Sequence, residues 1–287
     1  MQLPLTYLFV PGNRPERFAK ALAAGAGAVI LDLEDAVSPA EKRQARANIV
    51  QCAAAHPGLL DNILVRINDV ASEWFDADLE CLRQSGIRCA MLPKAESATA
   101  VAAVLPALAT GGAVVPLIET ARGVQDCAAI AGAPGVQRLA FGTLDYALDL
   151  ELADDPQGRG LAYPSAQIAI ASRAAGIATP IAGVTASLGD EERLLADLAF
   201  ARAFGFGAKL CIHPQQVGPI HRAFLPAERE VEWARRVVAA AVASGGAAQV
   251  DGKMVDRPVL LRAERILERT AGSGKDFPET TSHLPNH

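Results

Sequence analysis

Short apolar runs alternate along the chain with longer segments whose apolar residues recur at helical spacing. The short runs, rich in Val, Ile and Leu, predict strands near Thr6–Val10, Ala28–Leu33, Asn62–Ile67, Cys89–Pro93, Ala113–Ile118, Arg138–Gly142, Ile181–Val184 and Lys209–Ile212. The longer segments predict helices at Pro15–Ala24, Pro39–Ala55, Trp74–Gln84, Ser97–Leu108, Gly123–Ala131, Pro164–Ala175 and Glu191–Phe204. Strands that alternate with helices indicate right-handed βαβ units and a parallel sheet.

The predicted strands are continuous apolar runs without polar alternation, which indicates burial on both faces. Eight such strand and helix units in 287 residues are typical of one α/β barrel. We therefore expect an α/β protein with a TIM-type (β/α)8 barrel and a C-terminal helical extension. A doubly wound open sheet is the alternative, and the number of strands disfavours it.

The chain contains no internal linker rich in Pro, Gly or Ser that would divide the barrel. We assign residues 1–225 to the barrel and residues 226–270 to the extension, with helices at Pro226–Ser244 and Val259–Thr270. Residues 271–287 are polar, contain prolines and lack periodicity, so we expect a disordered tail.

Composition excludes several classes of protein. The net charge is −5, with acids and bases interspersed, so no nucleic-acid partner is expected. The five cysteines are odd in number and lack CxxC spacing, which is typical of a reduced cytoplasmic protein. The chain shows no secretory leader and no apolar run of roughly 18 to 20 residues, so we expect no membrane association.

Acidic residues follow two consecutive predicted strands. Glu119 comes directly after the fifth strand, and Asp145 follows the sixth. If these strands are neighbours in a barrel, both carboxylates converge at its C-terminal face, where they could bind a hard cation such as Mg2+. Taken singly, each residue has a simpler interpretation: Glu119 as the partner of a helix N-cap and Asp145 as a solvated turn residue.

The ends of the second and third strands are also charged. Asp32, Glu34 and Asp35 end an apolar run, where carboxylates are costly unless they are hydrogen-bonded or solvated. Alternation places Asp32 and Glu34 on the same side of the strand, and Ser38 is the expected N-cap of the next helix. Arg66 lies within an apolar strand, so its charge requires a partner. It could pair with Glu34 or hold a substrate carboxylate.

The end of the first strand combines a helix-start pattern with two cations. Asn13, Pro15 and Glu16 predict a capping box in which Asn13 is the N-cap. Arg14 and Arg17 oppose the helix dipole at that end. Binding of a phosphate or a carboxylate would explain them.

Together these segments resemble the citrate lyase beta-subunit-like proteins of the HpcH/HpaI aldolase and citrate lyase superfamily, which includes malyl-CoA and citramalyl-CoA lyases. The resemblance extends over about residues 5 to 270. The motifs that carry it stand in the same order, at Phe9–Phe18, Asp32–Val37, Val65–Asn68, Leu117–Gly123, Phe141–Asp145, Cys211–Gln215 and Gly252–Asp256.

The resemblance implies a Mg2+-dependent carbon–carbon lyase that cleaves a 3-hydroxyacyl thioester through an enolate. It implies Glu119 and Asp145 as metal ligands. Arg66 would hold the keto acid and stabilise the enolate oxygen. Asp256 would act as an acid/base in the active site of a neighbouring subunit.

Other positions would have supporting roles. By resemblance, Phe9, Arg14 and Lys20 contact the CoA moiety, while Glu34 and Asp35 surround the metal and Arg66 without binding the ion. At three positions the chain departs from the pattern of its relatives: Ala182 and Gly27 replace commonly acidic residues, and Glu151-Leu152 stands where a Gly is common.

The expected substrates are a citryl, malyl or citramalyl thioester of CoA or of an acyl-carrier protein. The keto acid would be oxaloacetate, glyoxylate or pyruvate. Three alternatives stay open: a malyl-CoA thioesterase with malate synthase-like activity, an aldolase for free hydroxy-keto acids, and a non-catalytic subunit of a citrate lyase-type assembly. The resemblance also implies a homotrimer, with or without citrate lyase partner subunits.

Overall fold

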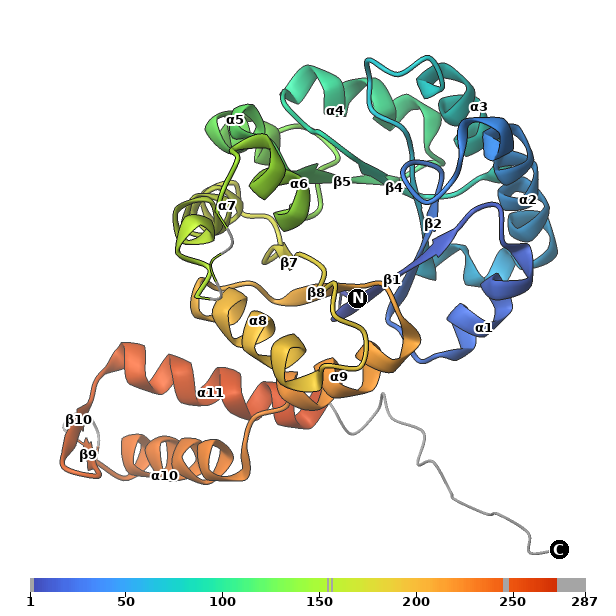
Figure 1. Ribbon diagram of the computed structural model, residues 1–287. Coiled ribbons are helices and arrows are strands. Elements are labelled where there is room, and N and C mark those ends of the chain that lie inside the picture. Colours follow the sequence, from blue (N-terminus) through green and yellow to red (C-terminus); the bar gives the residue numbers. More distant parts are fainter. Residues whose placement is uncertain (1–2, 154, 156, 245–247, 273–287) are drawn as a thin grey trace, which may run out of the picture. The chain divides into compact units, whose positions relative to one another are not determined.

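The computed structural model describes residues 3–153, 155, 157–244 and 248–272. Eight parallel strands form a closed barrel in chain order, with β1 paired to both β2 and β8 (Figure 1). The strands are β1 (Thr6–Pro11), β2 (Ala28–Asp32), β3 (Ile63–Arg66), β4 (Cys89–Leu92), β5 (Ala113–Ile118), β6 (Ala140–Phe141), β7 (Ile181–Ala182) and β8 (Ala208–Cys211). The predicted TIM-type (β/α)8 barrel is confirmed.

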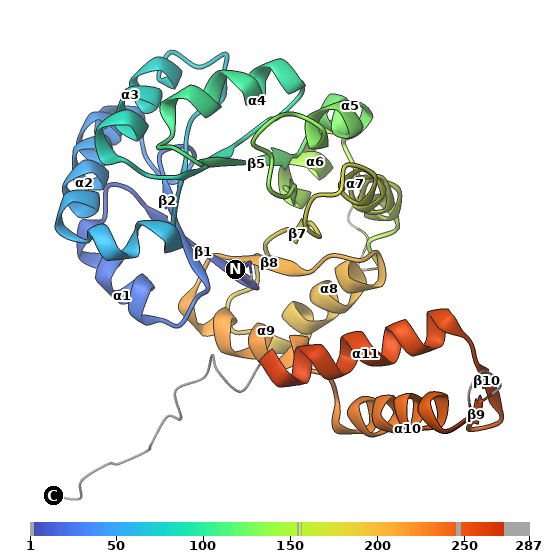
Figure 2. The same cartoon turned by 180° about the vertical axis from the view of Figure 1, so that it is seen from behind.

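Helices surround the ring of strands (Figures 1 and 2). They are α1 (Phe18–Ala23), α2 (Lys42–Ala55), α3 (Phe75–Ser85), α4 (Ala98–Val104), α5 (Ala121–Ala131), α6 (Thr143–Asp149), α7 (Ala162–Ala174), α8 (Glu191–Ala203) and α9 (Val217–Phe224). Short 3-10 turns precede or link several of them: η1 (Pro15–Arg17), η2 (Pro39–Glu41), η3 (Pro57–Asn62), η4 (Leu105–Ala107), η5 (Arg159–Leu161) and η6 (Pro214–Gln216). The sequence did not predict α6, because two helical turns are too short to show a clear periodicity.

Alternate residues of the strands fill the barrel interior. Their buried cluster comprises Tyr7, Ala28, Ile30, Leu64, Met91, Val115, Leu117, Ala140, Ile181, Ala208 and Leu210. Side chains two positions apart on a strand point to the same face. Asp32, Arg66 and Glu119 follow Ile30, Leu64 and Leu117 by two positions, so they continue the interior face at the C-terminal end of the barrel. We call this end the mouth.

The two predicted helix caps near the mouth have different outcomes: Asn13 is not an N-cap, whereas Ser38 is the N-cap of η2 but makes no side-chain capping bond. Arg14 rather than Asn13 is the N-cap of η1, and Asn13 Oδ1 is buried without a hydrogen-bond partner in the described residues. The Ser38 hydroxyl donates to Glu41 Oε2 at 2.6 Å instead of accepting from the backbone. In both 3-10 turns the third N–H already bonds to the carbonyl of the N-cap residue, at 2.9 and 3.0 Å, so it needs no side-chain cap.

A second compact unit begins at Arg222. It contains α10 (Glu228–Ser244), the antiparallel hairpin of β9 (Ala248–Val250) and β10 (Lys253–Val255), and α11 (Arg257–Gly272). The two helices lie side by side (Figures 1 and 2) and enclose a core of Val231, Ala234, Val237, Val250, Val255, Ala263 and Ile266. The first two residues of the predicted tail, 271 and 272, belong to α11, and residues 273–287 lie outside the described residues.

Two smaller expectations concern the thiols and the membrane. All five cysteines are free, as expected for a reduced protein. Within the described ranges, none of the helices has the length and apolar character needed to cross a bilayer.

Candidate functional site

Arg66 is held at the mouth by Asp32. The two residues are directly paired in the register of β2 and β3. Arg66 Nε donates to Asp32 Oδ1 at 2.7 Å, and Nη2 donates to Oδ2 at 2.6 Å. Asp32 also accepts hydrogen bonds from the backbone N–H groups of Glu34 and Ala36, at 2.9 and 3.2 Å. One buried carboxylate therefore fixes both the guanidinium and the loop that follows β2.

Two further acids approach the same guanidinium. Arg66 Nη1 lies 2.8 Å from Glu34 Oε2 and 3.5 Å from Asp35 Oδ2. Burial opposes the charge of Arg66, but Asp32, Glu34 and Asp35 together raise its pKa above the usual value. Arg66 also lies over the ring of Phe9, at 4.9 Å from the ring centre. The expected pairing with Glu34 is present, but the bidentate partner is Asp32, which sequence reasoning did not assign.

Glu119 extends from the end of β5 into the mouth and is only 2% exposed. Its Oε1 accepts a hydrogen bond from the backbone N–H of Lys94 at 2.8 Å. The N-cap of α5 is Thr120, whose hydroxyl accepts from Gly123 N at 3.0 Å. The simpler interpretation of Glu119 as a capping partner is therefore wrong, because Thr120 caps the helix and Glu119 bonds to the neighbouring β4 loop.

Burial raises the pKa of Glu119 to about 8. In reaching this value, the charges of Glu34 and Asp145 act in the same direction as burial, whereas the Lys94 N–H and the charge of Arg66 act against it. The carboxylate form of Glu119 is thus short of positive charge. A cation bound at the mouth would supply it.

Gly142 brings β6 close to Glu119. A Cβ atom at this position would lie 2.6 Å from Glu119 Cβ, so a side chain cannot be accommodated without displacing Glu119. The Gly142 N–H donates to Ile118 O at 2.9 Å, which continues the pairing of β5 with β6. Asp145 then lies in the first turn of α6, partly exposed and close enough for its charge to affect the pKa of Glu119.

Lys94 completes this side of the mouth. Its backbone is left-handed, with φ of 44°, a conformation that costs energy for a residue other than glycine. That conformation directs the Lys94 N–H at Glu119. The half-exposed ammonium lies 3.8 Å from Glu34 Oε1 and 3.9 Å from Asp69 Oδ2. The pattern of residue types does not predict this left-handed backbone at Lys94.

A buried network supports the loops from behind. Lys42 Nζ donates to the carbonyls of Leu33 and Glu34, at 2.7 and 3.0 Å, and to Asn68 Oδ1 at 2.8 Å. Asn68 Nδ2 in turn donates to Asp78 Oδ2 at 2.6 Å. These bonds fix the segments that follow β2 and β3. Sequence reasoning missed Lys42, which resembles any solvated lysine in a helical segment.

The charges at the mouth are unbalanced. Among the described residues, six acids (Asp32, Glu34, Asp35, Asp69, Glu119 and Asp145) face two cations, Arg66 and Lys94. Burial raises the pKa of Glu34 to about 7 despite the charge of Arg66. Within the described part of the chain, Glu34 Oε2 has Arg66 within 2.8 Å but receives no well-directed hydrogen bond. The mouth therefore favours an additional cation.

The carboxylates at the mouth suit Mg2+ better than a metal ion that takes all of its ligands from protein side chains. Across residues 3–153, 155, 157–244 and 248–272, no three His, Cys, Asp or Glu side chains are grouped closely enough to hold a metal ion alone. Mg2+ commonly uses one or two carboxylates and completes its shell with water and substrate oxygens. Glu119 and Asp145 can supply those carboxylates.

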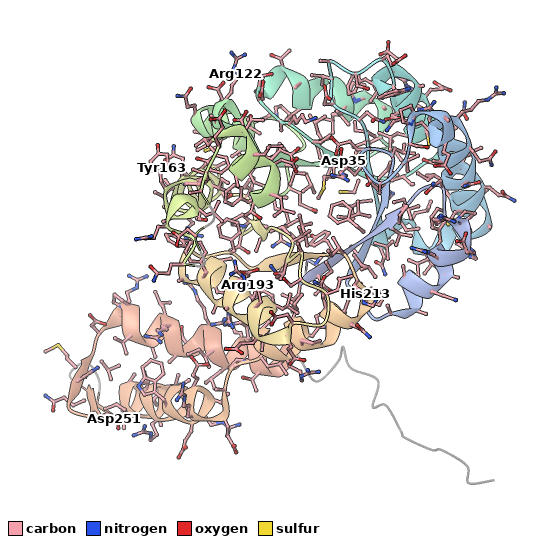
Figure 3. The ribbon with its side chains drawn as sticks, in the orientation of Figure 1. Asp35, Arg122, Tyr163, Arg193, His213 and Asp251 are labelled. Atoms are coloured by element: carbon pink, nitrogen blue, oxygen red, sulfur yellow. The ribbon has the colours of Figure 1, made fainter. Side chains whose placement is uncertain are left out.

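The other expected site residues are placed as follows. Phe9 lies at the mouth beneath Arg66, whereas Arg14 and Lys20 are exposed on η1 and α1. Asp256 belongs to the second unit, where its Oδ1 accepts from Val259 N at 3.0 Å at the start of α11. Figure 3 labels Asp35 within the ring of strands. The barrel thus brings together six of the expected residues: Phe9, Glu34, Asp35, Arg66, Glu119 and Asp145.

A cavity of about 810 Å³ lies in another sector, beside β6, β7, β8 and helices α6, α7 and α8. Its lining includes Phe141, Ala182 and Lys209 but not Arg66 or Glu119. Ala182, which replaces a commonly acidic residue, therefore faces this cavity. The arrangement of charge, rather than the volume of a cavity, identifies the mouth as the candidate site.

Comparisons with known proteins agree with this fold. A sequence model of the family described as HpcH/HpaI aldolase/citrate lyase matches residues 5–214. A citrate lyase subunit beta-like protein of Mycobacterium tuberculosis is 38% identical over 268 residues, covering 92% of this chain and 94% of that protein. A (3S)-malyl-CoA thioesterase of Cereibacter sphaeroides is 34% identical over 269 residues, covering 91% and 93%. The crystal structure of M. tuberculosis CitE with magnesium, acetoacetate and coenzyme A has a TM-score of 0.84 and 36% identity, covering 93% and 97%.

Proposed function

Because the chain belongs to the HpcH/HpaI aldolase/citrate lyase family, we propose that it is a Mg2+-dependent carbon–carbon lyase. It cleaves a 3-hydroxyacyl thioester of the citryl, malyl or citramalyl type into an α-keto acid and an acetyl thioester. The observation that carries this proposal is the excess of buried carboxylate around Glu119 at the mouth. The magnesium, acetoacetate and coenzyme A bound by the related CitE support the same class of substrate.

Glu119 and Asp145 hold the metal in this proposal. Mg2+ bound there supplies a Lewis acid that polarises the hydroxyl oxygen destined to become the ketone. The Lys94 N–H fixes the orientation of Glu119. Gly142 leaves room for the Glu119 side chain beside β6.

Arg66 provides positive charge that is already in place before the reaction. Asp32 accepts hydrogen bonds from the Nε–H of Arg66 and from one N–H of its Nη2. Each Nη nitrogen of a guanidinium carries two N–H bonds, so a second N–H remains on each. Those remaining donors can bind the carboxylate of the keto acid or the developing enolate oxygen. Because Asp32 holds the guanidinium rigidly, little reorganisation accompanies the reaction.

The bond changes define what the protein must do with protons. The substrate hydroxyl passes its proton to a carboxylate of the mouth as the carbon–carbon bond breaks, and the bonding electrons remain on the acetyl thioester as an enolate. That enolate carbon then accepts a proton to give the acetyl thioester. Asp256 of a second copy is the proposed acid, so the active form is a homo-oligomer, with a trimer as the expected state.

Binding of the thioester arm completes the proposal. Phe9, Arg14 and Lys20 would contact the CoA moiety, and the two exposed cations suit its phosphates. An acyl-carrier-protein thioester is the alternative carrier. In that case the chain would work with citrate lyase partner subunits, and CoA esters would be turned over poorly.

A second function, hydrolysis of the thioester, is favoured by one observation. The relative from Cereibacter sphaeroides is named a (3S)-malyl-CoA thioesterase. Hydrolysis would release free CoA and malate, whereas lyase activity would release acetyl-CoA and a keto acid. Separation of the CoA products by chromatography distinguishes the two reactions.

The proposed function is tested with a panel of citramalyl-, malyl- and citryl-CoA in the presence of Mg2+, with keto-acid formation as the readout. We expect turnover of at least one ester by the full chain and none by Glu119→Gln. Glu80→Gln, at an exposed position on the outer helix α3 where its partners are Arg83 and Gln84, is the matched control and should leave turnover unchanged. Keto-acid formation by Glu119→Gln at the wild-type rate would overturn the metal assignment.

A further inference from the structure

The cavity beside β6, β7 and β8 lies on the other face of the sheet from the barrel interior. Ala208 and Leu210 point into the interior cluster, and Lys209, which alternates with them, lines the cavity. We propose that this cavity is a binding site for a small monocarboxylate with an apolar chain, whose carboxylate pairs with Lys209. This proposal does not rest on the function proposed for the mouth.

Lys209 is a buried cation with unused donor capacity. It is 1% exposed, and its Nζ donates to Gly183 O at 2.7 Å. An ammonium group carries three N–H bonds. Among the described residues Nζ donates to Gly183 O, so two of its N–H bonds have no protein acceptor and are the ones that the proposed ligand would use. A carboxylate can accept both.

The acid nearest to Lys209 is already occupied. Asp197 Oδ1 lies 2.8 Å from Arg193 Nε, and its Oδ2 accepts from the Thr185 hydroxyl at 2.7 Å. Asp197 therefore favours the charge of Lys209 through space without bonding to it. Burial is the larger influence, and it lowers the pKa of Lys209 to about 8. An anion beside Nζ would offset that cost.

The other charged residues of the cavity wall are paired. Asp155 Oδ2 lies 3.0 Å from Arg159 Nε, and Arg193 pairs with Asp197. Among the lining residues that the structure describes there are three cations and two acids, and the cation without a paired acid is Lys209. The cavity favours an anion of single charge, because a dianion would reverse the imbalance.

Apolar side chains form much of the remaining wall, so the anion needs an apolar body. They include Phe141, Leu152, Leu161, Phe200, Ala201 and Phe206. A volume of about 810 Å³ is within the range of sites that enclose small molecules. A hydrated inorganic anion would leave these walls without contacts, whereas the chain of hexanoate or octanoate would pack against them.

The test is calorimetric titration of the metal-free protein with hexanoate, with hexanol as the uncharged analogue. We expect one hexanoate per chain, bound at least about tenfold more weakly by Lys209→Met, and hexanol bound weakly by both proteins. Lys94→Met is the matched control, because it removes a cation from the mouth and should leave hexanoate binding unchanged. Equal binding by wild type and Lys209→Met, or loss of binding in Lys94→Met, would overturn the proposal.

A second variant keeps the test independent of the stability of Lys209→Met. Ala201→Phe fills the wall of the cavity and retains the ammonium group. We expect this variant to lose hexanoate binding while its circular dichroism stays that of the wild type. Hexanoate binding at wild-type strength by folded Ala201→Phe would exclude the cavity as the site, as would the absence of binding to the wild type.

Discussion

Two buried cations of the same barrel, Arg66 and Lys209, have opposite surroundings. Arg66 lies at the mouth, with Asp32 bound in bidentate fashion and Glu34 within 2.8 Å. Lys209 lies on the outer side of β8 and, among the residues that the structure describes, bonds to the carbonyl of Gly183 alone. Burial opposes both charges. It prevails at Lys209, whose pKa is lowered, whereas the surrounding acids prevail at Arg66, whose pKa is raised.

The difference shows which ligand each region favours. Acids outnumber cations at the mouth, and burial raises the pKa of both Glu34 and Glu119. At the cavity the unmatched charge is positive. A buried charge without a directly bonded partner is unfavourable, so each region is stabilised by a ligand of the opposite sign. The mouth favours a cation such as Mg2+, and the cavity favours an anion.

Removal of Arg66, the better-paired of the two cations, should cause the largest loss in the free energy of unfolding. Arg66→Met leaves Asp32 and Glu34 buried without their counter-ion, so we expect a loss of about 3 to 5 kcal/mol in the free energy of unfolding. Lys209→Met removes a cation that bonds to one carbonyl, and its loss should be much smaller. Urea denaturation of the two variants measures this contrast. Equal losses of stability in the two variants would contradict the conclusion that Arg66 is better paired than Lys209.

A smaller change should weaken the mouth without removing a charge. The new Cβ of Gly142→Ala would lie 2.6 Å from Glu119 Cβ, so the carboxylate must move. We expect affinity for Mg2+ to fall about 10- to 100-fold, as it does when a group that orients a ligand is lost. Gly58→Ala is the control, because no atom lies within 4 Å of its new Cβ. Unchanged Mg2+ affinity in Gly142→Ala would mean that Glu119 is not a ligand.

Much of the mouth could be predicted because it depends on the order of strands. Glu119 and Asp145 follow consecutive strands, and consecutive strands are neighbours in this fold, so their proximity needed no knowledge of register. The pairing of Asp32 with Arg66 did need it, since the two are opposite only in the observed register of β2 and β3. The left-handed backbone of Lys94 depends on the tertiary structure in the same way.

The cavity could not be predicted at all. The apolar run predicts a strand that begins at Lys209, but residue types alone do not predict that the Lys209 side chain lines a cavity. That space depends on how α6, α7 and α8 pack against the strands. The wrong cap at Asn13 and the absent side-chain capping bond of Ser38 have a similar origin, because the pattern of residue types does not distinguish a 3-10 turn from an α-helix start.

The effects of pH on stability should be opposite in the two regions. Glu119 has a folded pKa of about 8, above that of an ordinary Glu, so between about pH 5 and 8 the folded state binds more protons than the unfolded state. The free energy of unfolding should therefore fall as pH rises through this window, by up to about 1.4 kcal/mol per pH unit. Lys209 has a folded pKa of about 8, below its ordinary value of 10.5, so Lys209 contributes a rise in stability between these pH values, opposed by the buried Cys81, Cys89 and Cys211, whose pKa values burial raises.

Denaturation of the metal-free protein at a series of pH values separates the two contributions. Glu119→Gln should make the fall between pH 5 and 8 shallower, with the remaining fall due to Glu34, and Lys209→Met should make the slope above pH 8 more negative. Each variant serves as the control for the other. A curve that keeps its wild-type slope in the corresponding variant would contradict the assigned pKa.

Titration of the protein with Mg2+ by calorimetry tests the central claim most directly, because it measures cation binding at the mouth without assuming a substrate. Wild type and Lys209→Met should each bind one Mg2+ per chain with the same affinity, and Glu119→Gln should show no binding. Binding of Mg2+ by Glu119→Gln with the stoichiometry and affinity of the wild type would contradict the account.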